Sequence, residues 1–574
     1  MTRAAFLVVL SIIAANASAA TKPAPPDPLI EAAVAAVGAG TLPAFAETVE
    51  RAASDALTDP ATANLPRLVQ LATLREFARW FARVPNPSPE QEAALTWLIR
   101  QRRMAPALLL SATSYDPPDR VLALLTALRK EQPDRLEQFP ELTAAVCLVW
   151  DDPDRLGGED RPIDPSRVVR IFRYYADNPR PTRDVANDLP VDQLIFVVDN
   201  LLSEPEIEWV RRQYVQVDVG NAFFEVGYGP TRDLKREPKP DDDPANAYTL
   251  ANLRKSGGRM VDQAYYAAQI GKTVGIPTAT CTGLEREGQE SQAWVAFQRD
   301  GRWDATTGRH RQHLASPGDV HDPQTMDTFP PGELALVSGV SRTSASNRAA
   351  AIALCKLMDR APAEKQFAAI KRAVELSPSD RRVWRRVADW GQQHRPESGE
   401  YKDVLGLITA HLAPRSEEAA VHVRLRMIAK VAAEDRAAAL AEMRSSFERR
   451  PDLVATVQLA RAAALMERKD ADGALRVLGE PLAMADTLPA HAVVAMRQVE
   501  DILRDRSRLE QLAEVYEDVW SRMRPPPQSP VAHTTPYYAI GQEYAQLLEE
   551  LGRKRDVERI RERLGELWAE PVRR

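Results

Sequence analysis

The stretch GGRMVDQA at residues 257–264 decides the fold of this 574-residue chain, together with the motifs that follow it, GIP at 275–277 and QAWV at 292–295. Paired glycines permit a tight turn, and the alanine-rich segment after them is typical of a helix that packs closely on its neighbours. Pro277 disfavours helical backbone in the residue before it and so marks where the helix has ended. Strand-like runs then occupy residues 278–282, 293–297 and 302–304. The sequence predicts a helix that begins near Met260 and packs on an antiparallel sheet.

In order and spacing these motifs resemble the thiol core of transglutaminase-like proteins. In that family a glycine-rich turn presents a nucleophilic cysteine at a helix N-terminus. A strand with the sequence His-Ala-Trp follows the helix, and a later strand carries an aspartate. Upstream segments at residues 194–199, 206–209 and 222–226 also resemble the lead-in of certain bacterial members. The resemblance covers about residues 166–336 and implies an α+β core.

The resemblance also locates the positions of the catalytic groups, and two of them carry other side chains. Met260 stands where the family has its cysteine, and a thioether has no acidic proton to lose. Gln292 stands where the family has its histidine, and an amide is not a base near neutral pH. The position of the family's aspartate falls on either Asp304 or Thr306, and the sequence does not decide between the two. The resemblance therefore implies a non-catalytic core whose residual cleft is lined by Gly258, Asp262, Trp294 and Trp303.

Two other side chains could supply a nucleophile. Cys281 lies on a strand-like run, where a small buried cysteine is common, and Ser256 precedes the glycine pair. We therefore expect Cys281 in the core. Ser256 has no motif-borne base near it in the sequence, so we expect it in a turn. They define the alternative function, an acyl-transferase or peptidase of the same class. A third hypothesis is an assembly component with an inert core.

Three histidines, His310, His313 and His321, lie close together with Asp319 and Asp322 beside them. Prolines and a glycine around these residues indicate a loop, and their spacing matches no established zinc motif. We therefore expect neither a metal ion nor another cofactor.

The first 20 residues have the pattern of a secretory signal peptide. Arg3 precedes an apolar run at residues 4–15, which is shorter than the ~20 residues that a membrane-spanning helix needs. ASA at residues 17–19 is a small-residue cleavage pattern. The mature chain should begin near Ala20 or Thr21, be periplasmic or secreted, and contain no membrane span.

Composition narrows the classes of partner. The formal net charge is only -6 and basic residues are mixed with acidic ones, so a nucleic acid is not expected as a partner. The chain has three cysteines, which are too widely spaced for a disulfide framework. Stability must therefore come from packing.

Both flanks of the core have helical periodicity. An N-terminal helical domain is predicted at residues 21–160, the transglutaminase-like core at 161–338 and a helical repeat at 339–574. Apolar residues between 367 and 374, then between 383 and 388, resemble one tetratricopeptide unit. We expect a C-terminal α-solenoid, with an irregular helical bundle as the alternative. The function expected from the whole sequence is an exported, non-catalytic protein that binds a protein or peptide partner.

Overall fold

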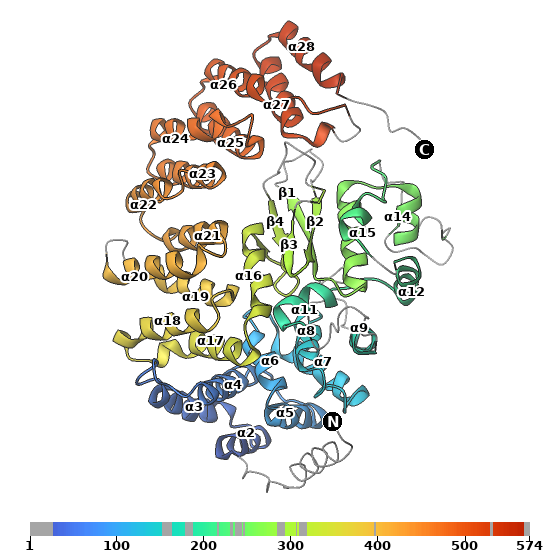
Figure 1. The fold of residues 1–574 in the computed structure, drawn as a ribbon, viewed down its shortest axis with the longest axis vertical. Coiled ribbons are helices and arrows are strands. Elements are labelled where there is room, and N and C mark those ends of the chain that lie inside the picture. Colours follow the sequence, from blue (N-terminus) through green and yellow to red (C-terminus); the bar gives the residue numbers. More distant parts are fainter. Residues whose placement is uncertain are drawn as a thin grey trace, which may run out of the picture.

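The fold is mostly helical and contains one small antiparallel sheet (Figure 1). Helices from the two ends of the chain form an arch, and the sheet with its own helices lies inside it. The computed structural model describes residues 27–151, 164–177, 188–214, 217–229, 234–235, 244, 247–283, 293–305, 307–308, 318–394, 398–528 and 532–567. The predicted signal peptide lies outside the described residues.

The N-terminal region is helical, as its periodicity predicts. Most of these helices begin with a proline in their first turn, a position where the missing N–H costs nothing. The helices are α2 (Pro28–Gly38), α3 (Leu42–Ala56), α4 (Leu65–Phe81), α5 (Pro89–Arg100), α6 (Met104–Ser111), α7 (Pro118–Glu131) and α8 (Pro140–Val149).

The central region contains the sheet and a set of short helices. The strands are β1 (Thr278–Gly283), β2 (Ala293–Arg299), β3 (Arg302–Asp304), β4 (Gly318–His321) and β5 (Thr328–Phe329), in the order β3-β2-β1-β4-β5. Every neighbouring pair is antiparallel. The helices are α9 (Pro165–Asp177), α11 (Val191–Val198), α12 (Glu204–Gln213), α13 (Val219–Phe223), α14 (Leu250–Ser256), α15 (Met260–Thr273) and α16 (Leu334–Gly339).

The two faces of the sheet belong to different apolar clusters. Ala293, Val295 and Phe297 on β2 face α15, whereas Trp294 and Ala296 face the opposite side with the main core. Helices α11 and α16 contact strands of that opposite face. The helix that begins at Met260 and the sheet behind it are confirmed. Strands β4 and β5 were not predicted from the sequence.

The C-terminal region is a curved stack of helices that rises along one side of the arch (Figure 1). From α22 to α28 each helix packs on the next, and α21, α23, α25 and α27 also contact one another in succession. The helices are α17 (Ala345–Leu357), α18 (Gln366–Leu376), α19 (Arg381–Gly391), α20 (Gly399–Leu407), α21 (Glu417–Ile428), α22 (Ala433–Ser445), α23 (Pro451–Glu467), α24 (Ala471–Ala483), α25 (Pro489–Asp505), α26 (Leu509–Arg522), α27 (Pro536–Glu550) and α28 (Lys554–Gly565).

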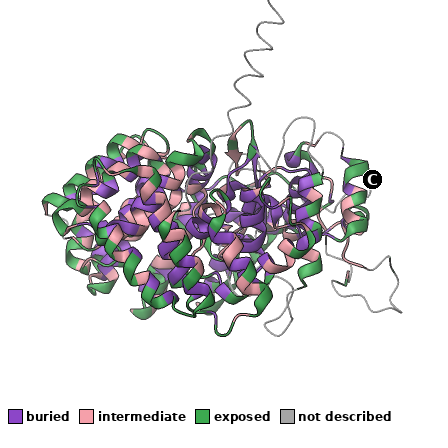
Figure 2. Cartoon of the chain, turned by 90° about the horizontal axis from the view of Figure 1, so that it is seen from below, coloured by how far each residue is buried: buried purple, intermediate pink, exposed green. Residues whose placement is uncertain are grey.

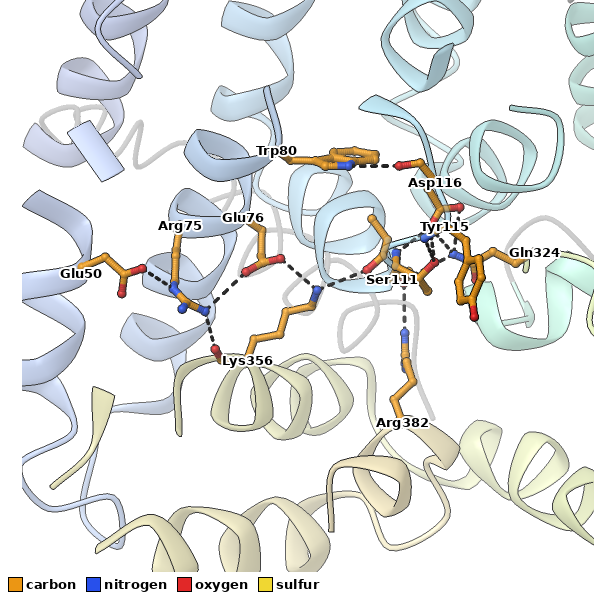
Figure 3. Close-up of polar contacts among 12 residues, drawn as sticks. Glu50, Arg75, Glu76, Trp80, Ser111, Tyr115, Asp116, Gln324, Lys356 and Arg382 are labelled. Atoms are coloured by element: carbon orange, nitrogen blue, oxygen red, sulfur yellow. Dashed lines mark hydrogen bonds and ion pairs between the residues drawn. The ribbon is translucent and has the colours of Figure 1, made fainter. Parts of the chain in front are cut away.

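A polar network joins the N-terminal helices to α17 (Figure 3). The side chain of Arg75, only 4 % exposed, donates to Glu50 Oε1 at 2.8 Å and to the backbone carbonyl of Lys356 at 2.5 Å. The ammonium of Lys356 in turn lies 3.1 Å from Glu76 and donates to the carbonyl of Ala112 at 3.2 Å. The two helical regions therefore share an interface and, with one face of the sheet, a continuous apolar core.

The C-terminal end of the arch contacts the central region. The hydroxyl of Tyr228 lies 2.7 Å from Nε2 of His533, and the two ring centroids are 5.6 Å apart. His533 belongs to a short 3-10 helix, Ala532–Thr534, just before α27. This contact connects the last helices to the segment that precedes α14.

Buried residues run through the middle of the molecule, and exposed residues cover the outer sides of the helices (Figure 2). Among the described residues, no helix combines the length and apolar character that a membrane crossing requires.

Candidate functional site

Met260 is the first residue of α15, as its resemblance to the family's cysteine position predicts, and it is only 2 % exposed. The two preceding glycines leave room for close contacts, with the backbone of Gly227 at Gly257 and with the side chain of Asp262 at Gly258. Gly257 has a φ of +78°, and a Cβ there would lie 2.6 Å from the carbonyl oxygen of Gly227. Gly258 donates to that same oxygen at 2.9 Å and accepts from Gly229 at 3.1 Å. The turn thus seats Met260 in the apolar cluster between α15 and the sheet.

The N-terminus of α15 already has a carboxylate partner. Asp262 Oδ2 accepts from the backbone N–H of Arg259 at 2.8 Å, and its Oδ1 accepts from the hydroxyl of Tyr248 at 2.7 Å. Its side chain is 2 % exposed. A carboxylate at this position satisfies an unpaired N–H and interacts favourably with the helix dipole. Asp262 therefore stabilises the helix N-terminus and is not exposed in a cleft.

The predicted tryptophans lie on the other side of the sheet from Met260. Trp294 is 1 % exposed and belongs to the main core, because side chains alternate between faces along β2. Trp303 on β3 also packs on that face, with its ring centroid 5.3 Å from that of Phe196 on α11. Neither tryptophan lines a cleft with Met260, which corrects the predicted arrangement.

Asp304 is also separated from Met260. It pairs with Phe297, which pairs with Thr278 directly after the turn that ends α15. Met260 starts the same helix 13 residues before Thr273, about 20 Å away along the helix axis at ~1.5 Å per residue. The sheet register therefore puts Asp304 near the opposite end of α15. The other predicted members, Gln292 and Thr306, lie outside the described residues.

The alternative nucleophiles occupy structural positions. Cys281 on β1 is fully buried on the face away from α15, as expected for a core residue. Ser256 is the last residue of α14. His321 on β4 lies 2.9 Å from the hydroxyl of Thr282, and burial lowers its pKa. Within the described ranges, no three His, Cys, Asp or Glu side chains are grouped as a metal site. His310 and His313 lie outside those ranges.

A buried hydroxyl cluster beneath α15 also lacks the features of a nucleophile. The hydroxyls of Tyr214 and Tyr266 are 2.5 Å apart, and Tyr214 donates to Glu225 at 2.5 Å. Burial raises the pKa of both tyrosines, that of Tyr266 to about 12. Neutral, mutually bonded hydroxyls anchor α15 to the preceding segment.

The sequence did not predict a pocket of about 820 Å³ where the N-terminal helices meet α17 and α19, which we call the junction pocket. Most of its wall is apolar, with contributions from Ile30, Val69, Ile99, Leu110 and Ile352. Pockets of this size with apolar walls and a few polar groups are typical of ligand sites. No single motif signals it, because its lining residues lie between positions 27 and 382.

Charged groups of both signs lie at one end of the junction pocket. Arg382 donates to Asp192 at 2.9 Å and to Asp380 at 3.0 Å. It also donates to the hydroxyl of Ser111 at 3.2 Å, the contact drawn in Figure 3. Burial alone would lower the pKa of Arg382, but the two carboxylates raise it. Burial raises the pKa of Asp192. Arg382 therefore has its partners within the protein, two carboxylates and one hydroxyl.

Glu141 and Arg348 also line the junction pocket, and they are arranged differently. Both are partly buried, and within the described part of the chain no ion pair joins them. Arg348 donates to the backbone carbonyl of Thr343 at 2.5 Å. Burial raises the pKa of Glu141, although the field of Arg348 opposes that effect. A carboxyl of this kind in a mostly apolar pocket is typical of a binding site.

A second pocket, of about 780 Å³, lies between α9 and α12. Its arginines already have partners within the protein. Arg173 lies 3.4 Å from Glu131, Arg170 lies 3.8 Å from Glu204, and Arg167 donates to the carbonyl of Leu201 at 2.6 Å. The junction pocket is the stronger candidate, because its wall is more apolar and Glu141 forms no ion pair with any residue that the structure describes.

Comparison with known proteins gives no relative from which a role could be transferred. No protein-family model, no curated protein and no solved structure matches the chain.

Proposed function

We propose that this protein is an exported, non-catalytic member of the transglutaminase-like superfamily that binds a protein or peptide segment in the junction pocket. The observation that supports a non-catalytic role is the buried thioether of Met260 at the start of α15. Asp262 already accepts from the N–H of Arg259 at the start of that helix, so a carboxylate occupies the helix N-terminus where a thiolate would be stabilised. The apolar wall of the junction pocket supports binding.

The first test concerns catalysis. The purified mature protein should show no amidase, peptidase or amine cross-linking activity. Acyl transfer that survives both Met260→Ala and Gln292→Ala would show that the chemistry lies elsewhere in the chain. Covalent labelling of Cys281 or Ser256 by an electrophilic probe would favour the alternative, an acyl-transferase or peptidase.

The second test concerns binding and compartment. A photoreactive amino acid replaces Val69, a partly buried residue of the junction pocket, in the protein expressed in its own cell. We expect a covalent adduct of defined mass that the same replacement at Thr48, exposed on α3, does not give. Mass spectrometry of the product should place its N-terminus near Ala20 or Thr21. Equal labelling at both positions would contradict binding in the pocket, and an intact Met1 would contradict export.

A further inference from the structure

The junction pocket combines an apolar wall with two opposite charges that do not neutralise each other directly. Glu141 comes from the first turn of α8 and Arg348 from α17, so they belong to the two helical regions that meet at the pocket. Asp192 and Arg382, in contrast, are joined by a hydrogen bond of 2.9 Å. Glu141 and Arg348 therefore retain bonding capacity toward a molecule in the pocket.

The bonding capacity of the two groups is complementary. A carboxylate accepts hydrogen bonds, and a guanidinium has five N–H donors, of which one on Arg348 is used by Thr343. A ligand that satisfies both must offer a donor and an acceptor next to each other. A ligand that covered these two groups without bonding to them would leave charges buried and unpaired, which is costly, so a ligand that supplies both a donor and an acceptor is favoured. A hydrocarbon chain supplies neither.

The peptide group has this combination, with one N–H and one C=O on each residue. The pocket volume of about 820 Å³ suits a short stretch of chain, and its wall favours apolar side chains. Arg102 and Arg103 at the rim are exposed, and no described carboxylate forms an ion pair with either, although the charge of Arg103 also acts on Glu141. Glu141 and Arg348 therefore contribute more to the selection of a ligand than Arg102 and Arg103 do.

We propose that the junction pocket binds an apolar peptide segment through its backbone, with Glu141 accepting from a peptide N–H and Arg348 donating to a peptide C=O. This inference rests on the proposed function and adds the chemical class of the ligand and the residues that select it. It distinguishes a peptide from a lipid or an aromatic compound of similar apolar surface.

The test uses the mature full-length protein and three probes. The first is a capped hexapeptide of alternating alanine and leucine, and the second is its ester analogue, in which oxygen replaces each backbone N–H. The third is the fluorescent dye pyrene, an aromatic hydrocarbon without a hydrogen-bond donor or acceptor. We expect the peptide to bind at least tenfold more tightly than the ester analogue. Removal of a hydrogen bond to a charged group accounts for a difference of this size.

Two variants assign that difference to the pocket. Glu141→Leu should weaken peptide binding about tenfold, leave dye binding unchanged and abolish the preference over the ester. Arg348→Met should weaken both peptide and ester, because both retain carbonyl groups. The matched controls are Glu47→Leu and Arg79→Met, at exposed positions outside the pocket. If Glu141→Leu does not fold, the comparison of peptide with ester in the unchanged protein still decides.

Equal binding of peptide and ester by the unchanged protein, or no peptide binding where the dye binds, would overturn the inference. If a photo-adduct forms at Val69 but the peptide shows no such preference, the proposed function stands. The ligand then makes contacts other than those proposed for Glu141 and Arg348. Absence of the adduct would remove the proposed function itself.

Discussion

The most informative perturbation of the fold is Arg381→Met. Arg381 pairs with Asp322, whose side chain is only 2 % exposed, and its guanidinium lies 4.2 Å above the ring of Phe329 on β5. This contact attaches the β4–β5 edge of the sheet to α19. Methionine keeps much of the volume but leaves the Asp322 carboxylate without its hydrogen-bonded cation.

The expected loss of stability depends on the hydrogen bonds that Asp322 keeps in the variant. Breaking a buried ion pair by removing one partner costs about 3–5 kcal/mol. Asp322 still accepts from the backbone N–H groups of Gln324 at 3.0 Å and Thr325 at 3.4 Å, so the cost should lie at the lower end, about 3 kcal/mol. Arg75→Met should cost less, because both of its carboxylate partners keep another cation: Glu50 has Arg360 at 2.7 Å and Glu76 has Lys356 at 3.1 Å.

The pH dependence of the variant has a definite sign. Burial alone would raise the pKa of Asp322, but Arg381 lowers it below its usual value. In the unchanged protein, ionised Asp322 therefore stabilises the fold at pH values above ~3.9, the pKa of an aspartate in the unfolded chain. That stabilisation is lost as the pH falls through the lower pKa that Asp322 has in the folded protein. Without Arg381 the effect of burial is opposed mainly by the backbone N–H of Gln324 and the charge of Arg385, so the pKa of Asp322 should rise. The deficit of the variant should then be largest near pH 7 and shrink as the carboxyl becomes protonated in acid.

Hydrogen exchange of β4 and β5 is the suitable measurement, because a chain of this size is not expected to unfold in one two-state step. Arg449→Met, at an exposed position, is the matched control. The double variant Arg381→Met with Asp322→Leu should recover at least half of the lost protection, since both charges are then absent. Unchanged protection in Arg381→Met, or a double variant less protected than the single one, would refute this reasoning.

Four further predictions concern α15 and the closure of the arch. In the folded Met260→Cys variant, the new thiol should react with iodoacetamide no faster than Cys355, whose pKa burial raises to about 12. Fast alkylation of the folded variant would contradict the buried position of residue 260. Adding Gln292→His should raise that reactivity above either single change if the transglutaminase-like proposal holds. Asp262→Ala should cost about 1–2 kcal/mol and increase exchange at the first turn of α15, whereas unaltered exchange would argue against its capping role. Tyr228→Phe and His533→Ala should each increase exchange in α27, and their effects should not add; additive effects would mean that the contact contributes nothing.

The fold of the central region could be predicted because its signals are local. The start of α15 at Met260 follows from a glycine turn, and strands β1 to β3 follow from residue preferences and the turn at Asp300-Gly301. Strands β4 and β5 are only four and two residues long, and their pairing is fixed by β1 and by Arg381 on α19. Short strands held by distant partners have no local signal.

The candidate site was less predictable for a related reason. A strand motif gives the order of residues, but the face on which a side chain lies depends on register, and a shift of one residue exchanges the faces. The motif therefore predicts Trp294 in a cleft with Met260, whereas the strand register puts it on the other side of the sheet. The junction pocket could not be found by motif at all, since α2, α4, α8, α11 and α17 meet only in the folded chain.

The packing of α17 on α4 and α6 has a consequence for the order in which the chain acquires its structure. Arg75 bonds to the carbonyl of Lys356, 281 positions later. During synthesis the amino end of the chain appears first. Helix α4 therefore cannot pack on α17 until the whole central region between them has been made. Contacts of such long sequence separation form slowly and leave apolar surface uncovered in the meantime. The helices that later form the pocket wall are then the segment at greatest risk of aggregation, and a chaperone that covers residues 28–111 until α17 arrives would act where the topology creates the delay.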